Sequence, residues 1–164
     1  MRKTSKKQFD PKLKLLMDQK SLWARQSFFE QHKCVVETNS IRETSGDFVV
    51  IHPTQGRKIV ESEVKLVWTR KGEWQGYRTV DIPFRKNGRV DADWFIMLNC
   101  SCDTLCITSI KRIHQSPTYK KDTIYTKQEK FFAVEPDCFR WFVLNDSKNG
   151  YWDNIGYSTH DSSV

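Results

Sequence analysis

Asp47, Glu63 and Lys65 are the side chains whose types and spacing could act on a phosphate group. They belong to the stretch SGDFVVIHPTQGRKIVESEVKLVW, residues 45–68, which otherwise reads as two apolar strands. Two neighbouring carboxylates repel each other unless one is protonated or a cation lies between them. Oxygen ligands without a Cys/His cluster favour Mg²⁺ or Mn²⁺, and a nearby lysine can orient water or balance the charge of a phosphate.

The elements that must position these side chains are the two strands of a β-hairpin. The stretch HPTQGRK predicts a three-residue loop, 54–56, whose glycine takes the left-handed conformation. Pro53 would then face Arg57. The same register predicts that Asp47 lies directly opposite Glu63, with Cβ atoms about 4.5–5.5 Å apart.

Alternation along the second strand predicts that Glu61, Glu63 and Lys65 project from one face. Val60, Ser62, Val64 and Leu66 would then project from the other. A second interpretation stays open, in which the hairpin has one solvated face and the charged residues form weak surface pairs.

This arrangement resembles the PD-(D/E)xK nuclease superfamily, which has the restriction-endonuclease-like fold. In that superfamily an acidic residue opens the second core strand and (D/E)-x-K lies in the third. Asp47 in SGDFVV and Glu63-Val64-Lys65 in ESEVKLVW match these positions, although Gly46 replaces the usual proline. A preceding helix and a later strand, DADWFIMLN, also fit. The resemblance covers roughly residues 20–110.

The resemblance implies an α/β fold, a restriction-endonuclease-like mixed β-sheet flanked by helices, in a single domain over residues 9–164. It implies a DNA endonuclease in which Asp47, Glu63 and the Val64 backbone carbonyl hold Mg²⁺ or Mn²⁺. Water oriented by Lys65 would attack phosphorus in line, with the leaving 3′ oxygen stabilised by the metal. Small members of the superfamily are homing or phage endonucleases or junction resolvases, and commonly work as dimers or tetramers.

Members of the superfamily often add an acidic ligand from the first helix. Glu30 in FFEQHK is the best-placed candidate, and Asp18 is the alternative. Glu61 lies on the expected site face and is either a further ligand or a charge at the rim.

The charge of the chain favours a nucleic-acid partner. The sequence holds 27 Lys and Arg against 20 Asp and Glu, a net charge of +7. Trp68, Trp74 and Tyr77 are candidate stacking or packing groups. The candidate phosphate-binding residues follow the E-x-K strand and are Arg70, Lys71, Arg78, Arg85, Lys86 and Arg89.

Two other functions stay open beside the DNA endonuclease. One is a nucleic-acid-binding domain without catalysis, and the other is a metal-dependent endoribonuclease. Cys100, Cys102 and Cys106 could be imagined as a zinc site, but their spacing lacks the paired ligands of zinc knuckles and favours small core residues. The absence of a phosphate-cradling glycine loop argues against NTPases and dinucleotide enzymes, so we expect no small-molecule cofactor.

The remaining elements follow from periodicity. Residues 1–8 predict a flexible basic arm, and residues 10–32 predict one bent helix or two. Six strands are expected in one large sheet, within residues 34–41, 47–52, 57–68, 77–84, 93–99 and 105–110. Residues 131–134 follow a polar stretch, and 138–144 predict either a short helix or a strand.

The composition of the chain indicates its class of protein and its cellular compartment. A chain of 164 residues with 38% hydrophobic residues suits one folded domain. The chain has five cysteines, an odd number, and no apolar stretch follows MRKTSKKQFD as it would in a signal peptide. We therefore expect reduced thiols and a protein located in the cytoplasm, which is the host's cytoplasm if a phage encodes the protein. No apolar run approaches the roughly 20 residues that span a bilayer, which gives no support to a membrane role.

Overall fold

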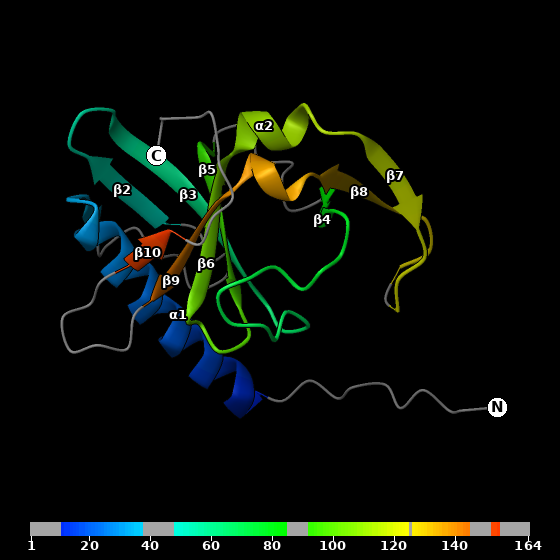
Figure 1. Ribbon diagram of the computed structural model, residues 1–164, viewed down its shortest axis with the longest axis horizontal. Coiled ribbons are helices and arrows are strands. Elements are labelled where there is room, and N and C mark those ends of the chain that lie inside the picture. Colours follow the sequence, from blue (N-terminus) through cyan, green and yellow to red (C-terminus); the bar gives the residue numbers. More distant parts are fainter. Residues whose placement is uncertain (1–10, 38–47, 85–91, 125, 145–151, 155–164) are drawn as a thin grey trace.

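The computed structural model describes residues 11–37, 48–84, 92–124, 126–144 and 152–154. The chain forms one long helix, a seven-stranded mixed sheet and a three-stranded antiparallel sheet (Figure 1). This α/β architecture agrees with the predicted fold class at that level. None of the helices in the described part combines the length and the apolar composition that crossing a bilayer requires.

Helix α1 runs without interruption over Pro11–Gln31, so the segment predicted as one bent helix or two holds a single helix. Pro11 occupies the first position, where its missing N–H costs no hydrogen bond. The helix ends because Lys33 takes the left-handed conformation, with φ of 61°. The amide of Cys34 then turns back to the Phe29 carbonyl at 2.9 Å, which satisfies one of the last helical carbonyls.

The larger sheet has the strand order β1-β2-β3-β5-β6-β9-β10. Its neighbours are antiparallel except for β3 and β5, which run parallel, with Glu63 beside Met97 and Lys65 beside Asn99. The strands are β1 (Val35–Glu37), β2 (Phe48–His52), β3 (Gly56–Lys65), β5 (Trp94–Asn99), β6 (Thr104–Ser109), β9 (Arg140–Leu144) and β10 (Trp152–Asn154).

The prediction of one sheet for all six early strands is wrong for residues 77–84. Strand β4 (Val80–Pro83) pairs with β8 (Glu129–Val134), which pairs in turn with β7 (Thr118–Lys121), and these three strands form the second sheet. Val80 and Ile82 are buried on one face of β4. Alternation of this kind reveals that one face is buried, but it does not reveal which sheet the strand joins.

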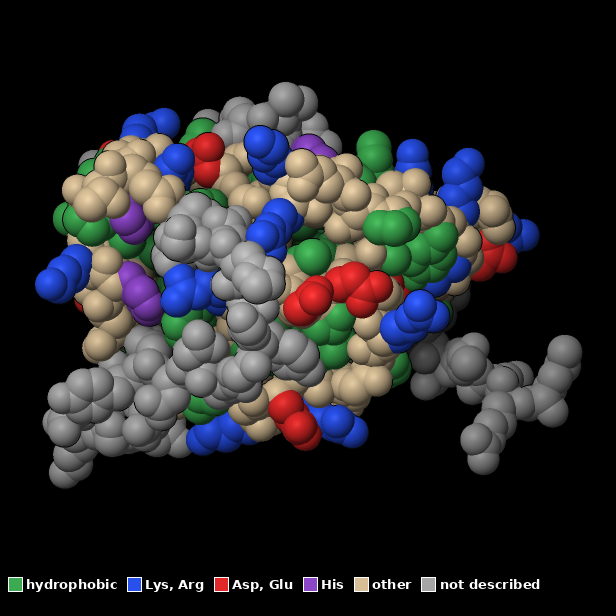
Figure 2. Space-filling model, turned by 45° about the horizontal axis from the view of Figure 1, so that its top comes forward, with side chains coloured by type: hydrophobic (Ala, Val, Ile, Leu, Met, Phe, Trp, Pro, Cys, Tyr) green, Lys and Arg blue, Asp and Glu red, His purple; other side chains and the backbone are tan. Residues whose placement is uncertain are grey.

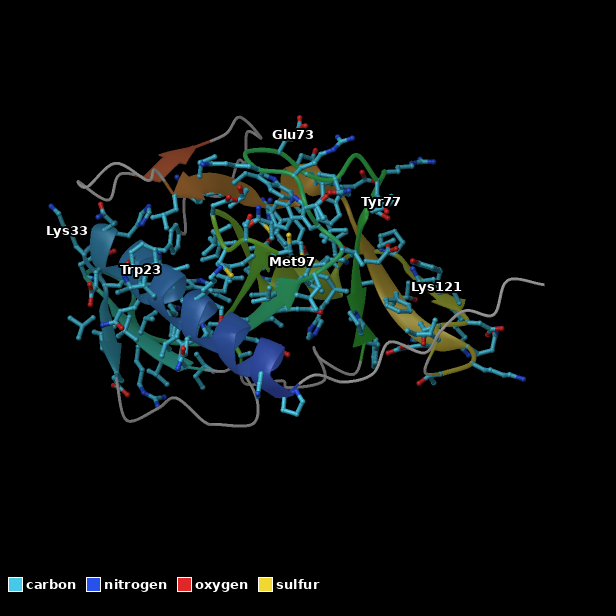
Figure 3. The ribbon with its side chains drawn as sticks, turned by 90° about the horizontal axis from the view of Figure 1, so that it is seen from below. Trp23, Lys33, Glu73, Tyr77, Met97 and Lys121 are labelled. Carbon is cyan, nitrogen blue, oxygen red and sulfur yellow. The ribbon has the colours of Figure 1, made fainter. Side chains whose placement is uncertain are left out.

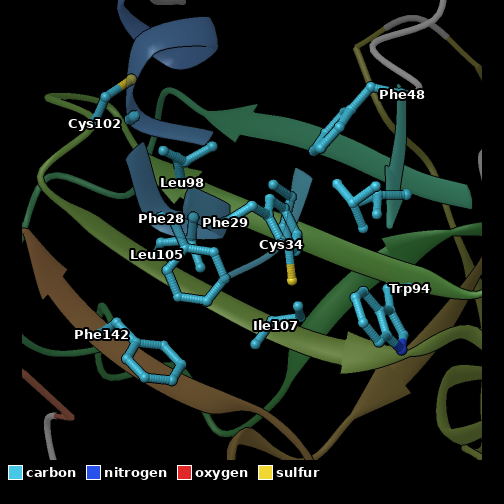
Figure 4. Close-up of a cluster of buried hydrophobic side chains, with 14 residues drawn as sticks. Phe28, Phe29, Cys34, Phe48, Trp94, Leu98, Cys102, Leu105, Ile107 and Phe142 are labelled. Carbon is cyan, nitrogen blue, oxygen red and sulfur yellow. The ribbon is translucent and has the colours of Figure 1, made fainter. Parts of the chain in front are cut away.

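Helix α1 covers one face of the larger sheet. Phe28 and Phe29 project from the helix into a cluster with Phe48, Trp94 and other buried residues of the strands (Figure 4). Ala24 of the helix and Val60 of β3 belong to the same cluster and have no exposed surface. This packing fixes α1 against β3, because Val60 is part of the strand that carries Glu63 and Lys65.

The opposite face of the larger sheet is covered by the second sheet and not by a second long helix. Phe95 and Trp141 of the large sheet share a buried cluster with Val80 of β4 and Phe132 of β8. Helix α2 (Ile110–His114) adds Ile110 and Ile113 to this cluster but has one turn. The mixed sheet is therefore flanked by the long helix α1 on one face, and by the second sheet and the short helix α2 on the other.

The segment 138–144 forms a strand, which settles the two alternatives left by the sequence. A 3-10 turn over Pro136–Cys138 precedes β9, and Trp141 donates from Nε1 to the Pro136 carbonyl at 2.8 Å. Strand β7 lies within the polar stretch that the sequence left unassigned.

Candidate functional site

The hairpin between β2 and β3 has a different register from the predicted one. His52 pairs with Gly56 and Ile51 pairs with Arg57, so the loop is 53–55 and the predicted Pro53–Arg57 pair is wrong. Gly56 has φ of 76°, which confirms its left-handed conformation. The register shifts because the ring of His52 caps the turn: Nδ1 accepts hydrogen bonds from the amides of Thr54 at 3.2 Å and Gln55 at 3.0 Å.

This register removes the basis for placing Asp47 opposite Glu63. Paired positions sum to 108 in the structure, whereas the Pro53–Arg57 pair required 110. The described ladder ends at the pair of Phe48 and Val60. Asp47 lies outside the described residues, directly before β2 in the chain.

The two faces of β3 point to different parts of the molecule, as alternation predicts. On the α1 side, Nη1 of the buried Arg25 donates to the Ser62 hydroxyl, and Val64 packs against the aromatic cluster. On the other side, Lys65 donates from Nζ to the backbone carbonyl of Asp81 in β4 at 3.2 Å. Glu61 and Glu63 share the side of Lys65, because side chains two residues apart in a strand lie on the same face.

Glu61 and Glu63 differ in exposure. The side chain of Glu61 is buried, with the residue 6% exposed, whereas Glu63 is half-buried. Withdrawing a carboxyl group from water costs free energy unless it is hydrogen-bonded, paired or bound to a metal ion. The face therefore combines a buried carboxyl group with a more accessible one.

Lys65 is held between β3 and the second sheet. Beside its bond to Asp81, its ammonium group lies over the ring of Trp74, 5.6 Å from the centroid. Burial lowers the pKa of Lys65, and the charges of Glu63 and Asp81 oppose that effect in part. An ammonium group with a lowered pKa and a fixed position is suited to proton transfer or to contact with a phosphate.

Asp81 binds Lys65 through its backbone and other groups through its side chain. Oδ2 lies 3.2 Å from the ammonium group of Lys121 in β7, and Oδ1 accepts the Thr79 hydroxyl at 2.9 Å. Burial alone would raise the pKa of Asp81, but hydrogen bonds from Tyr119, Thr79 and Lys121 lower it. Burial and the bond to Asp81 raise the pKa of Tyr119.

Asp81, Tyr119 and Lys121 lie next to the site but were not predicted from the sequence. One signal was available: an acidic residue within the apolar alternation of TVDIPF needs a partner if the strand is half-buried. The partner itself could not be inferred, because Lys121 is 40 residues away in the chain.

The acidic residue predicted from the first helix does not lie on the face of β3 that carries Glu63. Glu30 is exposed on α1, where its Oε1 accepts from Gln26 Nε2 at 3.0 Å. Helix α1 packs on the Ser62 side of β3, so the sheet lies between Glu30 and Glu63. Asp18 also belongs to α1.

The candidate phosphate-binding residues are described in part. Arg70 and Lys71 are exposed in the segment between β3 and β4, and Arg70 forms an ion pair with Glu73 at 3.6 Å. Arg78 is exposed in the same segment. Arg85, Lys86 and Arg89 lie outside the described residues.

The aromatic candidates separate into two kinds. Trp68 and Trp74 are buried at 0% and 3% exposure, pack edge-to-face 5.2 Å apart, and are therefore core groups and not stacking platforms. Tyr77 is 60% exposed and is available for stacking.

Two of the three cysteines considered for a zinc site lie in the core, on opposite sides of the sheet. Cys102 belongs to the cluster beneath α1, whereas Cys106 belongs to the cluster beneath the second sheet. This confirms the prediction of small core residues for Cys102 and Cys106, whereas Cys100 is partly exposed and belongs to neither cluster. Burial raises the pKa of the Cys102 thiol to about 11 and raises that of Cys106 as well. Within the described ranges, no group of three or more His, Cys, Asp or Glu side chains is arranged to hold a metal ion.

Comparisons with known proteins identify no relative. No protein-family model, curated protein or solved structure matches the chain.

Proposed function

We propose that this chain is a metal-dependent endonuclease that hydrolyses phosphodiester bonds in DNA. The observation that carries the proposal is the grouping of Glu61, Glu63 and Lys65 on one face of β3, with Glu61 buried and Lys65 tied to Asp81. Ionisable groups withdrawn from water and kept close together are typical of functional sites. The likeness of Glu63-Val64-Lys65 to the (D/E)-x-K motif supports the same conclusion.

The donor chemistry of this face fits a hard divalent cation. Two residues along a strand span about 6.6 Å, so the long side chains of Glu61 and Glu63 can converge on one ion. We assign these carboxylates, the Val64 carbonyl and Asp47 as ligands of Mg²⁺ or Mn²⁺. When bound, the ion would supply positive charge to the phosphate and to the leaving oxygen.

Lys65 has the second role in the proposal. One of its N–H groups is directed at the Asp81 carbonyl, which fixes the position of the ammonium group. We assign its other N–H groups to the attacking water and to a phosphate oxygen, where charge increases as the reaction proceeds.

The charge of the chain supports DNA as the partner. A net charge of +7 attracts phosphates, and Arg70 and Lys71 are exposed in the segment that follows β3. Cutting both strands of a duplex calls for two sites, so we propose a dimer or a tetramer as the active form.

Cleavage assays with supercoiled plasmid and a structured RNA test the proposal. We expect the wild-type protein to cut the plasmid with Mg²⁺ and to leave it intact with a chelator. Glu63→Gln and Lys65→Met are expected to lower the rate by about 10²-fold or more, while both proteins stay folded. Asp47→Asn tests the ligand assigned outside the described residues.

Glu135→Gln and Lys20→Met are the matched controls, because they change the same charges at exposed positions away from β3. Both are expected to cut at the wild-type rate. Cleavage of RNA alone would indicate an endoribonuclease. Binding without cleavage of either substrate would indicate a domain that binds nucleic acid without catalysis.

A further inference from the structure

The β7–β8 hairpin and the short helix before it carry much of the positive charge of the chain. Residues 111–134 hold six Lys or Arg and two Asp or Glu, a net charge of +4 out of +7 for the whole protein. Figure 1 shows β7 and β8 at one end of the molecule, and Figure 2 shows several Lys and Arg side chains at that end. Two of these positive charges, Lys111 and Arg112, belong to α2, and the other four are lysines of the hairpin.

Two lysines of the hairpin lie opposite each other. Lys120 of β7 and Lys130 of β8 are direct partners in the antiparallel register, and both are exposed. Like charges in directly opposite positions of a ladder repel each other. An anion bound between them would remove that repulsion.

The neighbouring lysine has a different role. Lys121 projects from the other face of β7, where it pairs with Asp81 and lies over the ring of Phe131, 4.7 Å from the centroid. This contact anchors the hairpin to β4, whose Asp81 carbonyl also binds Lys65. The β4–β8 ladder and this lysine fix the hairpin next to the proposed site. Lys120 and Lys130 project from the opposite face of the hairpin to Lys121, the face that carries Phe132, and both are exposed.

The turn of the hairpin is held by hydrogen bonds of its own. Asp122 accepts from the amide of Gln128 at 2.8 Å, and Thr123 exchanges bonds with Thr126 across the turn. Lys127 is exposed in this turn. In the described part of the chain, Lys120, Lys127 and Lys130 form no ion pair, although Lys130 lies over the ring of Phe84.

We propose that the β7–β8 hairpin binds the phosphate backbone of duplex DNA through Lys120, Lys127 and Lys130. The inference rests on the proposed function for the choice of DNA. The hairpin adds a second contact surface beside the site on β3, and its fixed position aligns the duplex with Lys65. Phosphate contacts of this kind set orientation and affinity without reading sequence.

The test is the salt dependence of DNA binding, measured by fluorescence anisotropy with a short duplex in the presence of a chelator. The triple variant K120Q/K127Q/K130Q is expected to bind at least about tenfold more weakly than the wild type. The plot of log association constant against log salt concentration has a negative slope, and its magnitude is expected to be about 2.7 smaller in the triple variant, since each phosphate contact contributes about 0.9. The thermal unfolding midpoint is expected to stay unchanged or to rise, because the Lys120–Lys130 repulsion is removed.

The matched control is K20Q/K33Q/R57Q, which removes three exposed positive charges on α1, the turn after it and β3. Lys33 lies at the end of the molecule opposite to Lys121 (Figure 3), so this variant is expected to keep the wild-type slope. Equal slopes for the wild type and the hairpin variant, or equal losses in both triple variants, would overturn the proposal. The proposal would also be overturned if the wild type bound no DNA, or if the hairpin variant lost more affinity for duplex RNA than for duplex DNA.

The chelator makes this result independent of cleavage. A wild-type protein that binds DNA through the hairpin but never cuts it would contradict the endonuclease and support the hairpin surface. A protein that cuts DNA but binds it equally well without the three lysines would contradict the hairpin surface alone.

Discussion

Lys65 donates a hydrogen bond to the backbone carbonyl of Asp81 and thereby connects the strand of the E-x-K motif to the second sheet. The side chain of Asp81 in turn pairs with Lys121. Three elements, β3, β4 and β7, therefore meet at Asp81, which binds Lys65 through its carbonyl and Lys121 through its carboxylate. This meeting point explains why the proposed site lies between the two sheets.

Lys65→Met is expected to abolish cleavage without loss of stability. Methionine keeps most of the length of the side chain. Burying the charged ammonium group of Lys65 costs free energy, which is why its pKa is lowered, and an uncharged side chain avoids that cost. We expect the free energy of unfolding in urea to stay equal to the wild-type value or to increase. A large loss of stability would show that Lys65 is a structural group.

Asp81→Asn is expected to destabilise the protein at neutral pH by about 1 kcal/mol, because the pair with Lys121 is lost. The pKa of Asp81 is lowered on folding, so its contribution is present above the unfolded-state pKa and is lost as the pH falls through the folded-state value. The difference between variant and wild type in urea unfolding is therefore expected to shrink from pH 6 toward pH 2. A difference that does not change with pH would contradict this account, and Glu135→Gln is the control.

Trp68→Ala is expected to destabilise the protein by about 3–5 kcal/mol, the usual cost of removing a buried aromatic side chain. Trp68 has no exposed surface, and its Nε1 donates to the Glu73 carbonyl at 2.8 Å. Tyr77→Ala is the comparison, since Tyr77 is exposed and should change stability by about 0.5 kcal/mol or less. Equal effects of the two changes in chemical unfolding would contradict the assignment of Trp68 to the core.

Cys102 and Cys106 are expected to resist alkylation in the folded protein. Both thiols are buried and have raised pKa values, which leaves little reactive thiolate. Cys100 is more accessible and serves as the internal reference. Mass spectrometry after treatment with a maleimide should find Cys100 modified first, with the other two modified after unfolding; labelling of Cys106 at the rate of Cys100 would be inconsistent with the structure.

The sequence predicted the local elements better than their assembly. The helix and the six early strands follow from periodicity and from turn residues, which act over a few positions. The membership of β4 in a second sheet depends on its pairing with β8, some 50 positions later, and no local pattern encodes that choice. Strand β7 was missed because residues 118–121 are mostly polar and exposed.

The site was likewise predicted correctly within one strand and incorrectly between strands. The common face of Glu61, Glu63 and Lys65 was predicted because alternation within one strand does not depend on the register of its neighbour. The register was predicted incorrectly because the His52 ring, not the glycine alone, determines where the turn begins. The contact of Lys65 with Asp81 joins two sheets and could be found in the structure alone.

The most direct test of the proposed site is the binding of Mn²⁺, followed by electron paramagnetic resonance of the free ion. We predict that the wild-type protein binds Mn²⁺ and that Glu63→Gln and Glu61→Gln each weaken binding by about tenfold or more, while Glu135→Gln does not. Equal binding by the wild type and both site variants would contradict a metal site on this face of β3.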